Sequence, residues 1–93
     1  MQTITQNHGK TIKSLKDIER SLLRIVANFD EILTAGKLFD LLKEKENISY
    51  ATFNRTLDKL EFLRLIDTKF TGKGARGNSR EIILRFNPKN YKI

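Results

Sequence analysis

The spacing of apolar residues changes once along this chain, directly after Arg64. Before that point they recur every three or four residues, which is typical of helices that bury one face. After it they alternate with polar residues, as they do in strands with one buried face. The change predicts a group of helices followed by a small antiparallel hairpin, and therefore an α+β fold.

The first helix is predicted over residues 14–29. Its apolar residues fall within about 100° on a helical wheel, the width of a stripe that faces a core. Ser14 followed by Asp17 resembles a capping box and is expected to mark the start of the helix. The stripe consists of Leu15, Ile18, Leu22, Ile25, Val26 and Phe29.

Two further helices are predicted over residues 35–45 and 50–63. Thr34 and Ser49 precede them as N-caps, because a hydroxyl oxygen can accept a hydrogen bond from a free N–H of the first turn. About four residues join the two helices, which is the short connection of a helix-turn-helix. The expected core residues are Leu38, Phe39, Leu41 and Leu42 in the second helix, and Phe53, Leu57 and Leu60 in the third.

Two strands are predicted after the helices, over residues 65–70 and 80–86. A glycine-rich loop joins them into a β-hairpin, and Pro88 ends the second strand. Residues 30–33 are expected to add a short bridging strand. The resulting order of elements is that of a winged helix-turn-helix, with a three-helix core and a β-hairpin wing.

The length of the chain, 93 residues, is sufficient for one domain. We expect a winged-helix domain over residues 14–88, preceded by a flexible basic arm over 1–13 and followed by a tail over 89–93. Because the arm and the tail are not needed for this core, they are available to form an interface. The sequence therefore predicts a homodimer.

The loop of the hairpin contains two near matches to phosphate-binding motifs. Gly72, Gly74 and Gly77 give G-x-G-x-x-G, and the P-loop pattern fails only where Asn78 replaces lysine. Both motifs require a helix to begin after the last glycine, whereas the residues that follow alternate like a strand. A dinucleotide site also needs an acid about 20 residues further on, and no acid follows Glu81. We reject both motifs and interpret the loop as a wing tip, where glycine permits positive φ and close approach to DNA.

Positive charge gathers in the last quarter of the chain. The net charge is +7 and the isoelectric point is about 9.9. From residue 69 onward, seven cations accompany a single acid, Glu81. Clustered positive charge of this kind predicts a nucleic-acid partner, here double-stranded DNA. The cations are Lys69, Lys73, Arg76, Arg80, Arg85, Lys89 and Lys92.

The composition argues against several other classes of function. The chain has no cysteine and one histidine, His8, so thiolate metal sites and cysteine nucleophiles are excluded. No pair of carboxylates converges on one helix face, and we expect neither an enzyme nor a metal or small-molecule cofactor. No apolar run reaches the roughly 18 residues of a membrane span, and no leader opens the chain. We expect a cytoplasmic, nucleoid-associated protein with no membrane partner.

The third helix is predicted to enter the major groove with its amino-terminal half. Arg55 suits a bidentate contact with guanine and Asn54 one with adenine, whereas Tyr50 suits either DNA or the core. Asp58 and Glu61 would repel DNA and should face away from it. The residues predicted to bind DNA are Ser49, Tyr50, Thr52, Asn54, Arg55 and Lys59 on the helix, and Lys73, Arg76 and Arg80 in the wing.

Residues 34–86 resemble the C-terminal winged-helix domain of archaeal origin-recognition initiators of the Orc/Cdc type. The likeness lies in TAGKLF, in LDKLEFLRLID and in GKGARGNSREI. It implies that the third helix and the wing grip origin DNA through Thr52, Asn54, Arg55, Lys73, Arg76 and Arg80. Two features differ: Arg64 stands where the family usually places glycine, and residues 1–33 are too few for the ATPase module of those initiators.

The chain is also similar to small DNA-binding regulators of archaeal genomes, viruses and plasmids. The leading hypothesis is therefore a sequence-preferring duplex-DNA-binding protein that regulates transcription as a homodimer. The alternatives are an origin-binding accessory protein similar to replication initiators, and a winged-helix module that binds protein. The last would need an exposed apolar patch, for which Phe62, Leu63 and Tyr91 are the candidates.

Overall fold

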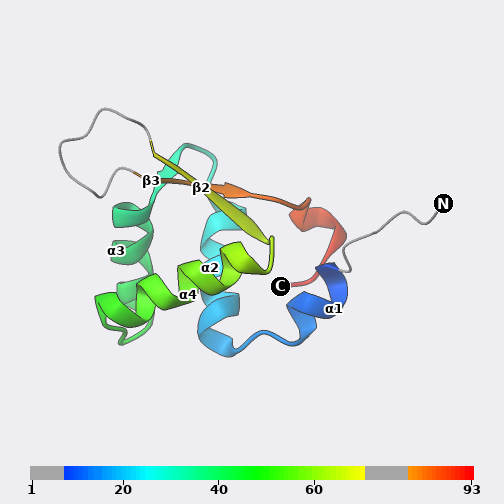
Figure 1. The fold of residues 1–93 in the computed structure, drawn as a ribbon, viewed down its shortest axis with the longest axis horizontal. Helices are drawn as coiled ribbons and strands as arrows, with labels where there is room; N and C mark the ends of the chain where they lie inside the picture. Colours follow the sequence, from blue (N-terminus) through cyan, green and yellow to red (C-terminus); the bar gives the residue numbers. More distant parts are fainter. Residues whose placement is uncertain (1–7, 71–79) are drawn as a thin grey trace.

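The computed structural model describes residues 8–70 and 80–93. In that part of the chain, helices cover one face of a small sheet, as Figure 1 shows. The expected α+β winged-helix fold is confirmed, with one additional helix at the amino end. The elements are α1 (His8–Lys13), α2 (Asp17–Asn28), β1 (Leu33–Thr34), α3 (Ala35–Lys45), α4 (Tyr50–Phe62), β2 (Ile66–Phe70), β3 (Arg80–Leu84) and the short 3-10 helix η1 (Pro88–Asn90).

The sheet is antiparallel, with β3 between β1 and β2. Ile66 pairs with Leu84 and Phe70 pairs with Arg80, so the predicted hairpin is confirmed. The bridging strand is present but lies later than expected, because Leu33 pairs with Ile82 while Glu31 and Ile32 precede the strand. Ile82 faces the core and Ile83 is exposed, as the alternating pattern predicted.

The core lies where α2, α3 and α4 meet the inner face of the sheet. The apolar stripes of the three helices supply most of it, as their helical spacing predicted. In α2, however, Leu23 is fully buried outside the predicted stripe, and the predicted residues Ile18, Ile25 and Phe29 are only partly buried. Replacing one fully buried leucine of this core by alanine should lower the free energy of unfolding by about 2–5 kcal/mol. The side chains with less than 2% exposure include Leu22, Leu23, Leu38, Leu42, Phe53, Leu57, Leu60, Leu65 and Ile66.

The helix α1 corrects the expectation of an arm without regular structure over residues 1–13. Residues His8–Lys13 are helical, and Ile12 is only 2% exposed. The guanidinium of Arg20 donates hydrogen bonds to the carbonyl oxygens of Ile12 and Lys13, at 3.1 and 3.0 Å. A six-residue helix is too short to form alone, so its packing against α2 stabilises it, which periodicity over so few residues does not reveal.

The predicted capping box at Ser14 and Asp17 is wrong. Helix α2 begins at Asp17 with Lys16 in an extended conformation at the N-cap, and the Glu19 carboxylate accepts a hydrogen bond of 2.8 Å from the Lys16 N–H. Ser14 instead donates through Oγ to the Thr11 carbonyl at the end of α1. The predicted caps of the next helices are confirmed, because Thr34 accepts from the Lys37 N–H and Ser49 from the Thr52 N–H.

The carboxyl end of the chain folds back on the domain. The rings of Phe86 and Tyr91 meet edge-on with their centroids 5.6 Å apart. Arg24 Nε donates to the carbonyl oxygen of Ile93 at 3.1 Å. The tail is therefore part of the fold of a single chain.

None of the helices in the described ranges has the length and apolar content that crossing a membrane demands.

Candidate nucleic-acid interface

The amino end of α4 is held in place by a network of hydroxyl groups. Ser49 Oγ accepts from the Thr52 N–H at 3.1 Å and donates to Thr52 Oγ1 at 3.0 Å. Thr56 Oγ1 donates to the Thr52 carbonyl at 2.8 Å. These bonds satisfy a free donor of the first turn and limit the rotation of Ser49 and Thr52. The first turns of α4 therefore present an ordered polar surface.

Two of the predicted base-reading side chains lie open beside this network. Arg55 is exposed, and its only hydrogen bond to a described residue is a long one of 3.5 Å to Thr52 Oγ1. Asn54 is half-buried, and its side-chain amide makes no hydrogen bond within residues 8–70 and 80–93. Both groups keep their full capacity for bidentate contacts with a purine edge.

Tyr50 lies between the interface and the aromatic part of the core, as its position in the sequence suggested. Its ring meets Phe39 edge-on at 5.2 Å and stacks near Phe53 at 6.0 Å. The residue is nevertheless 47% exposed. The aromatic contacts orient the ring, and the exposed edge faces solvent at the start of α4.

Lys59 is engaged in an ion pair. Its Nζ donates to Glu19 Oε2 at 2.8 Å, with side-chain exposures of 45% for Lys59 and 6% for Glu19. Burial of the Glu19 carboxyl acts to raise its pKa, but hydrogen bonds from Lys59 Nζ and the Lys16 N–H, with the charges of both lysines, bring that pKa below its ordinary value of 4.5. Lys59 thus ties α4 to the start of α2, and half of its side chain still faces solvent.

The predicted wing residues are only partly described. Arg80 begins β3, is half-buried and pairs across the hairpin with Phe70. Lys69 is exposed and lies opposite Glu81. Lys73 and Arg76 lie outside the described residues, as do the three glycines of the loop.

The acidic residues of α4 all lie in its carboxyl half. Glu61 accepts a hydrogen bond of 3.1 Å from Thr68 Oγ1 on β2, and so it is drawn toward the sheet. Asp58 is exposed one turn beyond Asn54 and on the open side of the helix. The sequence led us to expect that Asp58 faces away from DNA, and its exposed position meets that expectation only in part. The first two turns of α4 are therefore free of acidic side chains, and the acids begin at Asp58.

A hollow of about 220 Å³ separates α4 from the start of α2. Lys16, Arg55 and Lys59 line it together with Glu19 and Thr52. Sequence reasoning missed Lys16 and Glu19, because they belong to a different helix from the one predicted to bind DNA. A signal was present in the Lys16–Glu19 spacing, which places an acid three residues after the N-cap.

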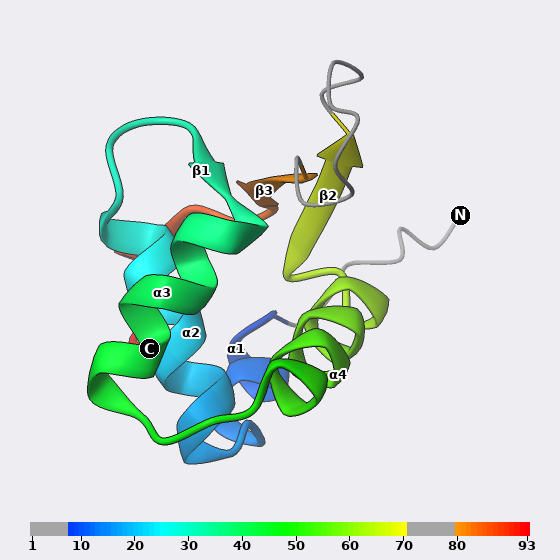
Figure 2. The same cartoon turned by 90° about the vertical axis from the view of Figure 1, so that its left-hand side faces the viewer.

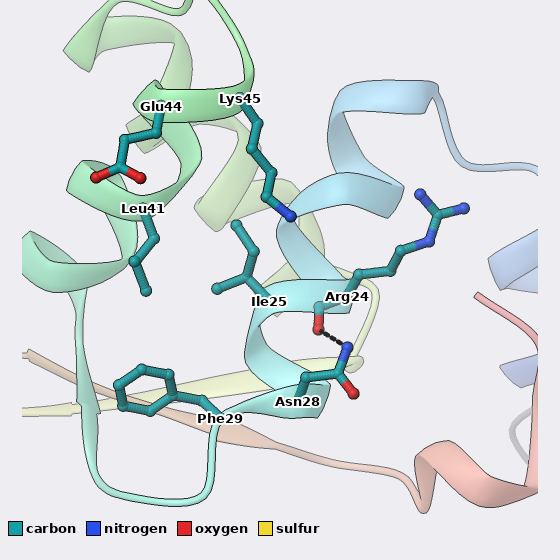
Figure 3. A pocket seen from close by; sticks show the side chains of 7 residues that line it. All are labelled: Arg24, Ile25, Asn28, Phe29, Leu41, Glu44 and Lys45. Atoms are coloured by element: carbon teal, nitrogen blue, oxygen red, sulfur yellow. Dashed lines mark hydrogen bonds between the residues drawn. The ribbon is translucent and has the colours of Figure 1, made fainter.

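A second hollow lies between α2 and α3, away from α4 (Figure 3). It has a volume of about 340 Å³ and an apolar floor of Ile25, Phe29 and Leu41. Charged side chains surround that floor, among them Lys45. Elsewhere in the described part of the chain, no three histidine, aspartate or glutamate side chains gather closely enough to hold a metal ion.

The three residues considered for a protein-binding patch do not share an exposed surface. Phe62 is 83% exposed at the end of α4. Leu63 and Tyr91 are partly buried and pack against the core. One exposed phenylalanine at the end of a helix does not make an apolar patch.

Several known proteins are similar to this chain. ORC1-type DNA replication protein 2 of Methanothermobacter thermautotrophicus is 51% identical over 82 residues, which is 88% of this chain and 22% of the relative. The protein of the same name from Methanosarcina mazei is 37% identical over 81% of this chain and 20% of its own length. ORC1-type DNA replication protein 3 of Haloarcula marismortui is 30% identical over 84% of this chain and 20% of its own length.

The chain spans about one fifth of the length of these relatives. No family model matches it, and no solved structure does. The similarity to the relatives nevertheless extends over 81–88% of this chain. The winged-helix fold and these matches agree with the predicted resemblance: the chain is similar to a part of archaeal ORC1-type DNA replication proteins.

Proposed function

We propose that this chain binds double-stranded DNA, with the amino half of α4 in the major groove and the hairpin against the backbone. The observation that carries the proposal is the polar surface of Thr52, Asn54 and Arg55, ordered by Ser49 and free of acids over its first two turns. An α-helix fits the major groove, and these residue types suit base edges there.

The side chains divide into two roles. Arg55 and Asn54 read bases, because each presents a pair of donors, or a donor and an acceptor, to a purine. Ser49 and Thr52 suit phosphate or thymine-methyl contacts at the groove edge. Lys73, Arg76 and Arg80 of the hairpin contribute a grip that depends on charge and not on sequence.

The sequence is compatible with two finer versions of this function, transcriptional regulation and origin binding. The relatives are named as replication proteins, and none of those described is named as a transcription factor. We therefore favour a role at a replication origin. The chain would contribute DNA binding to that process, and the ATPase chemistry of initiators is not part of the proposal.

Selection from a random duplex library tests the readout. The purified protein is mixed with the library at about physiological salt, and retained DNA is sequenced. The Arg55→Ala variant should then lose about 1–3 kcal/mol of binding free energy on the enriched sequence, and very little on unrelated DNA. Lys45→Ala is the matched control, because Lys45 lines the α2–α3 hollow on the other side of the domain.

Two results would contradict the proposal. Absence of any duplex retention would remove DNA binding altogether and favour the protein-binding alternative. Equal losses for Arg55→Ala on enriched and unrelated DNA would show that α4 does not read bases.

A further inference from the structure

The hollow between α2 and α4 lies on the flank of α4 that faces away from the hairpin. Glu61 meets Thr68 of β2 on one flank, whereas Lys59 meets Glu19 of α2 on the other. Residues two apart in a helix are turned by about 200°, so the two contacts mark opposite sides of α4. In Figure 2, β2 rises above α4, and the start of α2 lies to the lower left of α4.

The charges around this hollow do not balance. Three cations, Lys16, Arg55 and Lys59, share it with one carboxylate, Glu19. That carboxylate already accepts from the Lys16 N–H and from Lys59 Nζ, both at 2.8 Å. The ammonium of Lys16 is exposed and makes no hydrogen bond within the described residues. The hollow therefore has net positive charge and free donors.

The geometry of a helix in a groove explains what would meet this flank. The major groove is about 12 Å wide and an α-helix with its side chains is about 10–12 Å across. A helix lying there has a phosphate backbone along each side. The hairpin accounts for the backbone on one side only.

We infer that this hollow receives a phosphate of the second DNA backbone at its Lys16 and Lys59 side, so that the domain grips the duplex on both sides of α4. This inference rests on the proposed function. Lys16 and the exposed part of Lys59 supply positive charge, and the Thr52 hydroxyl lies at the rim as a further donor. Charge-assisted contacts of this kind fix the register of a helix in the groove.

The test is the salt dependence of binding by Lys16→Ala. Binding to an enriched and to an unrelated duplex is measured by fluorescence anisotropy from 0.05 to 0.5 M KCl. Loss of one phosphate contact should weaken both complexes about five- to tenfold near 0.1 M salt and make the slope of log affinity against log salt shallower by about 1. Lys16→Arg should retain the wild-type slope, and Lys45→Ala serves as the control for loss of one distant charge.

Ethylation interference locates the phosphate itself. One ethylated phosphate that weakens the wild-type complex should have no effect on Lys16→Ala. Wild-type affinity and slope for Lys16→Ala, with DNA binding by the wild type intact, would overturn this inference and leave the proposed function standing. Failure of the wild type to bind any duplex would overturn both.

Discussion

At the residue scale, the end of α4 is closed by a pair of backbone hydrogen bonds around Arg64. The Leu65 N–H donates to the Leu60 carbonyl and the Arg64 N–H donates to the Glu61 carbonyl, both at 3.0 Å. Arg64 has φ of 64°, in the left-handed region. This is a Schellman motif, and the buried side chains of Leu60 and Leu65 accompany it. Arg64 therefore occupies a conformation that favours glycine.

Replacing Arg64 by glycine should therefore stabilise the domain. Glycine adopts positive φ without the steric penalty of Cβ, and the expected gain is about 1 kcal/mol in the free energy of unfolding. Urea denaturation of wild type, Arg64→Gly and Arg64→Ala measures it. Alanine retains the Cβ and is the control, so an equal gain for both variants would show that loss of the arginine side chain, and not relief of the backbone, is responsible.

Residue-level chemistry was predictable where one side chain acts on its own helix. Thr34 and Ser49 cap their helices as their positions indicated. Arg64 stands where the resemblance places glycine, and it adopts the left-handed conformation all the same. The start of α2 was not predictable in this way. Ser14 had the right chemistry, but the chain ends α1 there, and a contact with Lys59 from far along the sequence selects Glu19 instead.

At the element scale, the Glu19–Lys59 pair sets how α4 lies against α2. Changing Glu19 to glutamine should destabilise the protein by about 1–2 kcal/mol at pH 7, toward the low end for a charged hydrogen bond because the Lys59 ammonium is partly solvated. The pKa of Glu19 in the folded state is below 4.5. The stabilisation is therefore complete above pH 4.5 and is lost as the pH falls through the lowered folded pKa.

Urea denaturation of wild type and Glu19→Gln between pH 3 and 7 checks this dependence. The difference in stability should stay constant from pH 7 to about 5 and narrow below 4.5. Asp17→Asn, at an exposed position on the same turn of α2, is the matched control. A difference that remained constant down to pH 3 would mean that the charge of Glu19 contributes nothing to folding.

Among the elements, those with long periodic patterns were predicted closely. The second helix was expected over 35–45, and α3 has those bounds. Helix α1 was not predicted, and β1 was predicted too early in the sequence. Each of these short elements is stabilised by contacts with distant residues and not by its own sequence. The interface follows the same rule. The sequence of α4 predicts its own DNA-binding side chains, whereas Lys16 joins them only because α2 packs beside α4.

At the scale of the whole molecule, the segments that suggested a homodimer are used within one chain. Ile12 of α1 is buried, and Tyr91 and Ile93 of the tail pack against the same domain. The large exposed apolar side chains are spread over several elements, from Ile32 before β1 to Phe62 at the end of α4. A stable dimer interface generally buries about 800 Å² on each partner with an apolar centre. We propose instead that one chain binds one site.

Sedimentation equilibrium at tens of micromolar should then give a mass near 10.8 kDa. The enriched DNA should contain a single asymmetric element, because a monomer has no two-fold axis to match. Retention at 1:1 stoichiometry on that element, measured by sedimentation of the complex, follows from the same argument. An inverted repeat with half-sites about one helical turn apart, bound by two chains, would instead establish the homodimer. The surface that joins the two copies would then be expected around Ile32 and Ile83, which line a common hollow beside β3.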